Sequence, residues 1–338
     1  MQTYLITGGA GFIGSNFIKY LLEKHNDIRI INVDKLTYAG NLENLKEIQN
    51  HPNYRFIKAD IGDQEAISKI FMESNIDYVV NFAAESHVDR SIQHPKVFVE
   101  TNVLGTVNLL NIAKATWETA SGFPVGKKFV QISTDEVYGS LGDTGFFTEE
   151  SPLDPHSPYS ASKASADLMV KAYYDTYKMP VNITRCSNNY GAYQFPEKLI
   201  PLMIDHCLNH KPLPLYGDGL NIRDWLYVED HCKAVDLVIR NGKLGEVYNI
   251  GGHNERTNVH IVKTIIQYIN KNVDSAVTEK LIAYVEDRKG HDRRYAIDPA
   301  KIKNELGWEP ETSFEEGIIM TIQWYLQNKD WMDQLQRR

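Results

Sequence analysis

The chain has 338 residues, enough for one large α/β unit or for such a unit joined to a smaller one. Hydrophobic residues make up 42% and charged residues 24% of the chain, which is typical of a soluble globular enzyme. The formal net charge of −8 argues against general nucleic-acid binding, although local basic residues can still bind a small anion.

The cysteines and the N-terminus indicate the compartment. Cys186, Cys207 and Cys232 are far apart and form no C-x-x-C pair, so the sequence predicts neither a disulfide framework nor a zinc site. The N-terminus lacks the basic and long apolar segments of a signal peptide, and no apolar run reaches membrane-spanning length. We therefore expect a cytoplasmic protein without a bound metal.

Strands and helices alternate through the first half of the chain. The pattern predicts strands at 4–7, 28–33, 54–58, 78–82, 129–133 and 181–185, and helices at 11–24, 66–72, 97–117 and 159–177. The strands are continuous apolar runs, as in a parallel sheet that is buried on both faces. This alternation predicts an α/β fold with a doubly wound parallel sheet, the Rossmann architecture.

The composition and the periodicity of the sequence change after about residue 189, where prolines cluster and the predicted helices become less regular. We expect residues 1–190 to form the first domain. A segment near 225–252, with a strand at 247–250, is predicted to return to its sheet. Residues 191–338 are predicted to form a smaller, irregular C-terminal α/β domain.

Three glycines follow the first strand with the spacing G-x-x-G-x-x-G, at Gly8, Gly11 and Gly14. They permit a tight turn and let the backbone approach a pyrophosphate, which the N-terminus of the next helix favours. Asp34 lies 20 residues beyond Gly14, where a carboxylate accepts hydrogen bonds from the adenosine ribose and repels a 2′-phosphate. The pattern predicts NAD in preference to NADP, although the neighbouring Lys35 opposes this preference slightly.

Two further segments fit contacts with the cofactor. Asp60 and Ile61 follow the third strand, near the expected adenine. Phe82, Ala83 and Ala84 end the fourth strand, where small residues permit close approach of a flat ligand. Simple packing explains both segments equally well from their spacing alone.

Tyr159 and Lys163 form a Y-x-x-x-K pattern within a predicted helix, so that they share one face. An ammonium near a phenol favours the phenolate, which can accept a hydroxyl proton while a hydride leaves for NAD. Ser133 and Thr134 end the fifth strand at the cofactor edge of the sheet, where a hydroxyl can hold the substrate oxygen. Together these residues predict an alcohol-oxidising site.

These motifs, with Val137-Tyr138-Gly139, resemble the extended short-chain dehydrogenase/reductase family over essentially the whole chain. The resemblance implies a Rossmann domain that binds NAD and a C-terminal domain that holds a nucleotide sugar. Further cofactor contacts that it implies are at Phe12, Ile13, Lys35, Leu36, Thr37, Gly40, Ser86, Thr101, Ser133, Tyr159, Lys163 and Asn188.

Two adjacent acids, Asp135 and Glu136, follow Thr134 directly, at positions where sugar epimerases of the family usually have small or uncharged residues. A ketone at carbon 4 of a sugar acidifies the proton at carbon 5. A base can then remove that proton while an acid protonates the hydroxyl that leaves carbon 6. The stretches 34–41, 84–91, 133–139, 186–191 and 195–201 resemble the dTDP-glucose 4,6-dehydratase branch of the family.

This resemblance implies dTDP-glucose as the substrate and a role for each catalytic residue. Tyr159 is expected to take the hydroxyl proton, with Lys163 tuning it and Thr134 holding the hydroxyl. Glu136 is expected to take the proton from carbon 5, and Asp135 to protonate the departing hydroxyl. NAD is then regenerated in every turnover and stays bound.

The resemblance also places the nucleotide diphosphate against the C-terminal part of the chain. Arg223 and Arg288 are expected to clamp the diphosphate, because one guanidinium group can donate two parallel hydrogen bonds to phosphate oxygens. The other implied substrate contacts are at Ser86, His87, Thr134, Asn188, Glu197, Lys198, Leu199, Pro214, Tyr216, Asn258, His291 and Tyr295. Related enzymes pair the two long helices across a two-fold axis, so a homodimer is expected, with no nucleic-acid or membrane partner.

Two other functions stay open. An epimerase or decarboxylase of the same family would share the cofactor site but has no need of Asp135 and Glu136. A non-catalytic NAD-sensing regulator would tolerate the loss of Tyr159 or Lys163, and both are present. Thymine and uracil share the edge that proteins usually read, so thymidine follows from the resemblance alone.

Overall fold

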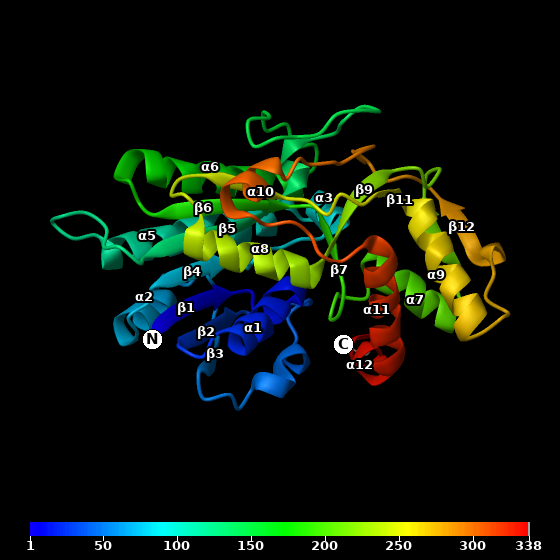
Figure 1. The fold of residues 1–338 in the computed structure, drawn as a ribbon, viewed down its shortest axis with the longest axis horizontal. Coiled ribbons are helices and arrows are strands. Elements are labelled where there is room, and N and C mark those ends of the chain that lie inside the picture. Colours follow the sequence, from blue (N-terminus) through cyan, green and yellow to red (C-terminus); the bar gives the residue numbers. More distant parts are fainter. Residues whose placement is uncertain (337–338) are drawn as a thin grey trace.

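A seven-stranded parallel sheet lies at the centre of the computed structural model, which describes residues 1–336 (Figure 1). Its strand order is β10-β6-β5-β4-β1-β2-β3, and each pair of neighbours is parallel. The predicted doubly wound sheet is thereby confirmed. The strands are β1 (Gln2–Thr7), β2 (Ile28–Asp34), β3 (Tyr54–Lys58), β4 (Tyr78–Asn81), β5 (Lys128–Thr134), β6 (Val181–Cys186) and β10 (Val247–Ile250).

Helices cover both faces of this sheet and explain why its strands are apolar throughout. One face packs against α1 (Phe12–Lys24) and α8 (Val228–Asn241). The other face packs against α2 (Gln64–Glu73), α5 (Thr106–Trp117) and α6 (Pro158–Tyr177). Successive residues of a strand point to opposite faces, so Tyr4 and Ile6 join the first core while Leu5 joins the second.

The order of the strands reverses between β1 and β4, which lie side by side although β2 and β3 intervene in the sequence. Ligands of such sheets bind in the crevice outside the carboxyl ends of the strands at this reversal. The glycine turn after β1, Asp34 at the end of β2 and Thr134 at the end of β5 all lie on that edge. The fold therefore brings the predicted cofactor and catalytic segments to one place.

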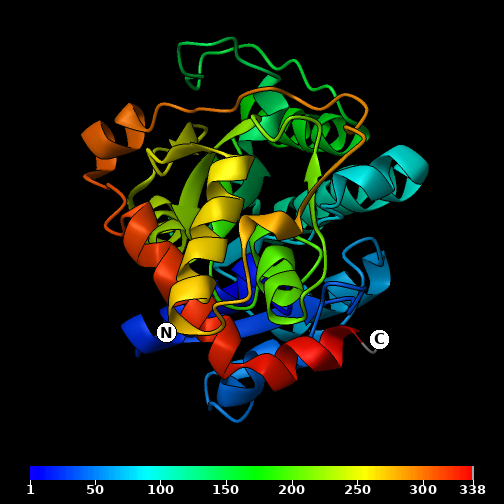
Figure 2. The same ribbon diagram turned by 90° about the vertical axis from the view of Figure 1, so that its right-hand side faces the viewer.

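A second group of elements extends beyond the carboxyl edge of the sheet (Figures 1 and 2). Its apolar core is formed mainly by four helices and by strands of two small sheets, ordered β11-β9-β7 and β12-β8. The helices are α7 (Leu199–Leu208), α9 (Asn258–Asn272), α11 (Phe314–Gln327) and α12 (Lys329–Gln336), and the strands are β7 (Asn188–Tyr190), β8 (Leu213–Tyr216), β9 (Ile222–Tyr227), β11 (Glu255–Thr257) and β12 (Ile282–Val285). Short helices complete the chain: α3 (Val88–Gln93), α4 (Pro95–Phe98), α10 (Ala300–Leu306), η1 (Leu42–Ile48), η3 (Asp135–Tyr138) and η4 (Glu279–Leu281).

The predicted uninterrupted helix over 97–117 contains a π-helical segment, η2 (Val99–Gly105). Asn102 within it is buried and holds the loop after β4: its side chain accepts a hydrogen bond from the Glu85 amide at 2.8 Å and donates one to the Glu85 carbonyl at 3.0 Å. Single π-helical turns are often found at functional sites. Here the segment carries Thr101 to the wall of the cleft described below.

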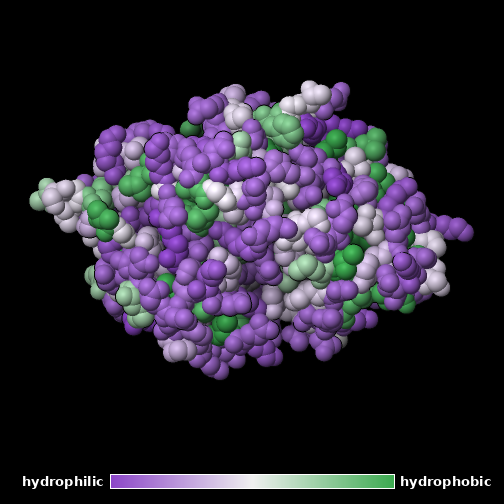
Figure 3. Space-filling view, in the orientation of Figure 1, coloured by the Kyte–Doolittle hydropathy of each residue, from purple (hydrophilic) through white to green (hydrophobic). Residues whose placement is uncertain are grey.

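The surface in Figure 3 mixes hydrophilic and hydrophobic residues, with hydrophilic ones covering most of that face. No helix within residues 1–336 has the length and apolar character needed to cross a membrane. Cys186, Cys207 and Cys232 are buried free thiols.

Candidate active site

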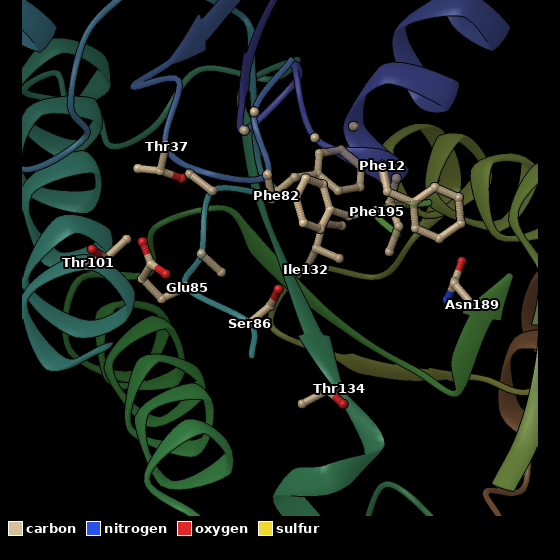
Figure 4. Close-up of a pocket in the computed structure, with 18 of the residues that line it drawn as sticks. Phe12, Thr37, Phe82, Glu85, Ser86, Thr101, Ile132, Thr134, Asn189 and Phe195 are labelled. Carbon is tan, nitrogen blue, oxygen red and sulfur yellow. The ribbon is translucent and has the colours of Figure 1, made fainter. Parts of the chain in front are cut away.

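A cleft opens at the carboxyl ends of the strands, beside the reversal of strand order. Its wall contains the glycine turn, the ends of β2, β4 and β5, one face of α6 and the segment from β6 to α7. In Figure 4, Phe12, Phe82 and Phe195 gather on one side, Glu85 and Thr101 lie on the other, and Thr134 stands at the end of its strand.

The glycine turn has room only for hydrogen at two of its positions. Gly8 has a φ of +70°, and a Cβ placed on it would lie 2.6 Å from the backbone nitrogen of Ala83. A Cβ on Gly14 would lie 2.5 Å from the carbonyl oxygen of Gly8. The helix that follows has Gly11 as its N-cap and no capping side chain, so its first N–H groups are available to an anion. This cradle fits a pyrophosphate.

Asp34 is held in place by backbone amides while its carboxylate lines the cleft. Oδ2 accepts a hydrogen bond from the Ala10 amide at 2.9 Å, and Oδ1 accepts one from the Leu36 amide at 2.7 Å. Lys35, the neighbour that opposed the preference for NAD, pairs with Asp60 at 2.6 Å. Its positive charge is therefore compensated, which strengthens the case for unphosphorylated ribose.

The predicted cofactor residues come together with one exception. All of them line the cleft except Leu36, which has a φ of 59° and packs against the sheet core. Its contribution is the backbone amide that orients Asp34. Leu36 therefore contributes to the cofactor site indirectly, by orienting Asp34.

The five predicted catalytic residues all line the same cleft: Thr134, Asp135, Glu136, Tyr159 and Lys163. The Lys163 ammonium is buried and donates a hydrogen bond of 2.6 Å to the carbonyl of Ile132, two residues before Thr134 on β5. This bond fixes the lysine against the end of the strand.

The Y-x-x-x-K pattern predicts that Lys163 lowers the pKa of Tyr159, but the surrounding protein groups do not lower it. Burial raises the pKa of Tyr159 well above its usual value, and the charge of Glu136 raises it further. Burial lowers the pKa of Lys163 itself, while Asp167 one turn later on α6 opposes that change. The reason for the difference is desolvation, which a sequence pattern does not report.

Asp135 and Glu136 occupy different electrostatic environments although they are adjacent. Burial raises the pKa of Asp135 well above its usual value, and the charges of Glu136 and Asp224 add to this. Burial also raises the pKa of Glu136, but three cations oppose the rise, namely Arg223, Lys198 and Arg288. The protonated form is thus favoured at Asp135, and the cations favour the carboxylate at Glu136. Such a separation suits an acid and a base in one site.

The predicted substrate residues fall into two groups. Ser86, Thr134, Asn188, Glu197 and Lys198 line the cleft. The other nine lie outside its wall, at the N-terminus of α3, on α7, α9, β8 and β9, and in the segment 287–295: His87, Leu199, Pro214, Tyr216, Arg223, Asn258, Arg288, His291 and Tyr295.

The two predicted clamps already have protein partners. Arg288 donates to both carboxylate oxygens of Asp89, at 2.5 and 2.8 Å, and its guanidinium lies 5.1 Å from the centre of the Tyr216 ring. Arg223 stacks on Tyr295 at 4.2 Å and donates to the backbone carbonyls of Ile222 and Asp292. A diphosphate at Arg288 must therefore share or displace Asp89, whereas no carboxylate within residues 1–336 pairs with Arg223.

Known proteins resemble this chain over almost its whole length. The family model for GDP-mannose 4,6 dehydratase matches residues 5–321. A dTDP-glucose 4,6-dehydratase of Xanthomonas campestris is 51% identical over 336 residues, which cover 98% of this chain and 95% of that protein. The chain belongs to the dTDP-glucose 4,6-dehydratase family.

Solved structures of the dTDP-glucose 4,6-dehydratase family superpose closely on this chain. The enzyme of Bacillus anthracis, in complex with NAD, has a TM-score of 0.89 and 54% identity, covering 99% of this chain and all of that one. The enzyme of Streptomyces venezuelae, also with NAD bound, has a TM-score of 0.92 and 45% identity, with 99% and 100% coverage. A UDP-glucose 4-epimerase of Thermotoga maritima is more distant, with a TM-score of 0.86 and 30% identity over 97% of this chain and 100% of that one.

Several wall residues of this dehydratase-family site were missed by sequence reasoning. Tyr38 stacks on the Arg90 guanidinium at 3.6 Å and meets the ring of Phe195 edge-on at 5.5 Å, and both aromatic residues line the cleft. Glu85 also faces the cleft. All three lie in stretches that resemble the dehydratases, so membership of those stretches was the available signal. The remaining missed residues are Val33, Ala39, Ala59, Ile132, Cys186, Ser187, Asn189 and Gln194.

Proposed function

We propose that this protein is a dTDP-glucose 4,6-dehydratase, which converts dTDP-glucose to dTDP-4-keto-6-deoxyglucose and water. The observation that carries the proposal is the pair Asp135 and Glu136, buried beside Tyr159 and Thr134 in one cleft. Oxidation alone needs only the tyrosine, the lysine and the threonine. The two additional acids supply the groups that an elimination requires.

NAD is the cofactor that fits the nucleotide-binding end of the cleft. The turn at Gly8, Gly11 and Gly14 would hold its pyrophosphate, and Asp34 would accept hydrogen bonds from its adenosine ribose. When bound, NAD accepts a hydride from carbon 4 of the sugar and later returns it to carbon 6.

Tyr159 removes the proton from the hydroxyl at carbon 4, and Thr134 holds that hydroxyl. Because burial and Glu136 raise the pKa of Tyr159, the phenolate needs a compensating positive charge. Lys163 lies one turn along α6 and is fixed on the Ile132 carbonyl. Its ammonium is the group assigned to this compensation.

Elimination then uses the two acids in opposite roles. Glu136 takes the proton from carbon 5, a double bond forms between carbons 5 and 6, and the bond from carbon 6 to its hydroxyl breaks. Asp135 delivers a proton to that hydroxyl, which leaves as water. The cations Arg223, Lys198 and Arg288 oppose the rise that burial causes in the pKa of Glu136, and burial raises the pKa of Asp135 further, which supports these two roles.

We assign the cofactor to residues 1–190, with the segment near 225–252, and the nucleotide sugar to residues 191–338. We further propose a homodimer formed through η2, α5 and α6. Val99, Leu104 and Leu168 are 48%, 57% and 59% exposed on η2 and α6, which pack side by side, so they form an apolar surface suited to a second copy. The three free thiols fit a reducing compartment, and we assign the protein to the cytoplasm.

A turnover panel with dTDP-glucose, UDP-glucose and GDP-mannose tests the proposed function by product mass. We expect loss of one water from dTDP-glucose, with slower or no turnover of the other two. A product of unchanged mass would support an epimerase instead, and no product from any of the three would contradict an enzyme of this class.

A further inference from the structure

Asp224 on β9 is a buried carboxylate outside the set of residues that bind or react. It is 0% exposed. Oδ2 accepts a hydrogen bond from the Gly252 amide at 2.7 Å, and Oδ1 accepts one from the Asn254 amide at 2.8 Å. Among residues 1–336 no lysine, arginine or histidine forms an ion pair with it. Burial raises the pKa of Asp224, and the amides of Asn254 and Gly252 oppose this rise because they favour its charged form. With an amide on each oxygen, Asp224 is better suited to carry a negative charge than a buried carboxyl group without such donors.

The pairing of the strands places Asp224 two strands away from the acid of the elimination step, in the same row. Thr134 on β5 pairs with Cys186 on β6, and Asn188 on β7 pairs with Trp225 on β9. Asp135 follows Thr134, Ser187 lies between the two paired residues of the middle strands, and Asp224 precedes Trp225. Asp135, Ser187 and Asp224 therefore form a row across the ends of these strands.

The protonation of Asp135 depends mainly on its buried surroundings, because its carboxyl group makes few hydrogen bonds. It is 1% exposed, and its Oδ1 accepts a hydrogen bond from the Thr134 hydroxyl at 3.2 Å. Its Oδ2 is buried and has no hydrogen-bond partner among the described residues. A buried oxygen without a donor is poorly suited to carry charge and well suited to carry a proton for transfer.

We propose that Asp224 is a positioning residue for the dehydration: its fixed negative charge keeps a proton on Asp135, so that Asp135 enters the elimination as an acid. The inference rests on the proposed function. The charged and titratable groups that face Asp135 are Glu136 on η3, Tyr159 on α6, Cys186 on β6, and Arg223 and Asp224 on β9.

Asp224 differs from the other anion in this set by being permanent. Glu136 also disfavours ionisation of Asp135, but Glu136 gains the carbon 5 proton during the reaction and its charge is then lost. Arg223 acts in the opposite direction and favours the carboxylate of Asp135. Both oxygens of Asp224 accept hydrogen bonds from amides, and Asp224 exchanges no proton in the proposed cycle, so we assign it the negative charge throughout. Burial together with the charges of Glu136 and Asp224 raises the pKa of Asp135, in agreement with this role.

The test compares Asp224→Asn with a matched control, Asp230→Asn. Asp230 is equally buried and its Oδ2 accepts hydrogen bonds from the Glu311 and Thr312 amides at 3.1 and 2.8 Å, so its replacement disturbs a similar pair of amide contacts. Its Oδ1 also pairs with Lys233 at 3.1 Å, so the control additionally loses one ion pair. Asp230 is not among the groups that shift Asp135. The holoenzymes are mixed with dTDP-glucose in single turnovers at a series of pH values. The rise in bound NADH reports oxidation, and its decay reports elimination followed by hydride return.

We expect Asp224→Asn to oxidise at the wild-type rate at every pH. Its elimination should fail at a lower pH than in the wild type, because Asp135 loses its proton sooner. Asp230→Asn should keep the wild-type profile, and Asp224→Glu, which keeps the charge, should restore it. An unshifted profile in Asp224→Asn, or an equal loss of oxidation and elimination, overturns the proposal.

A second measurement applies if Asp224→Asn does not fold. Infrared difference spectra between the wild-type and Asp135→Asn holoenzymes should show a protonated Asp135 carboxyl at neutral pH, and an ionised one overturns the inference. Failure of the wild type to release water from dTDP-glucose would instead contradict the proposed function itself.

Discussion

Replacing Glu136 by Gln removes the base for carbon 5 and keeps the shape of the side chain. The charge of Glu136 is one of the causes that raise the pKa of Tyr159. Its removal should therefore make the phenolate easier to form, so that oxidation continues and extends to lower pH. Elimination should fail, because Gln cannot accept the proton. The enzyme should stall with NADH and a 4-keto sugar bound.

The size of the effect follows from the environment of the carboxylate. General acid-base groups contribute about 100- to 10,000-fold to rates, which corresponds to roughly 3 to 5 kcal/mol in activation free energy. Glu136 faces the charges of Arg223, Lys198 and Arg288, and a neutral Gln removes its attraction to all three, so we expect the loss to lie toward the upper end.

Single-turnover absorbance of bound NADH after mixing with dTDP-glucose is the assay. Glu136→Gln should form NADH that persists, Asp135→Asn should form NADH that decays slowly because water can protonate the leaving hydroxyl, and Tyr159→Phe should form little NADH. Loss of oxidation in Glu136→Gln as complete as in Tyr159→Phe would show the roles to be wrong. Near-normal dehydration in Glu136→Gln would show that these acids are not the elimination pair.

The pH profile of the wild-type elimination gives a related check in the same assay. Glu136 must be unprotonated, and its pKa is raised, so activity should be lost on the acid side at a pH above that of an ordinary glutamate. Asp135 must be protonated, and its pKa is raised as well, so activity should be lost only as the pH rises through that raised value.

Three further predictions follow from the site. Purified protein should carry bound NAD, and steady turnover should not release that nucleotide as NADH. Gly8→Ala should not retain NAD, because the added Cβ would lie 2.6 Å from the Ala83 nitrogen. The absorbance of bound and of free nucleotide measures both outcomes. Arg223→Ala and Arg288→Ala should raise KM more than they lower kcat at a pH where Glu136 is ionised, since a diphosphate lies away from the reacting carbons, and unchanged KM values in both would place the clamp elsewhere. At lower pH kcat should fall as well, because both cations lower the pKa of Glu136. Light scattering at micromolar concentration should give a dimer, and a monomer would contradict the interface assigned to η2, α5 and α6.

The sequence predicted most elements of the sheet because their signals are local. Residues 54–58 and 247–250 are strands with the predicted bounds, and the other five strands agree within two residues at each end. Buried parallel strands are continuous apolar runs, and the chain shows them plainly. The prediction of an uninterrupted helix over 97–117 was less accurate, because the π-helical turn depends on Asn102 binding the loop after β4.

The candidate site likewise has parts that local sequence patterns predicted and parts that needed the structure. The glycine spacing, Asp34 and Y-x-x-x-K could be read from the chain, since each depends on one turn, one strand end or one helix face. The doubly wound sheet was predicted from the alternation of strands and helices, whereas the order of its strands, which brings Asp34, Thr134 and Lys163 to one cleft, came from the structure.

What the sequence by itself determined was the fold class, the position of the nucleotide-binding turn and the identity of the two adjacent acids. Only the tertiary structure decided the protonation tendencies of those acids and of Tyr159, because they depend on burial and on charges from distant segments such as Arg223, Asp224 and Arg288. The structure also decided that Arg288 is bound to Asp89, a contact between residues 199 positions apart. Local patterns carry no information on desolvation or on such long-range pairs, so the electrostatics of the site became visible only in the folded chain.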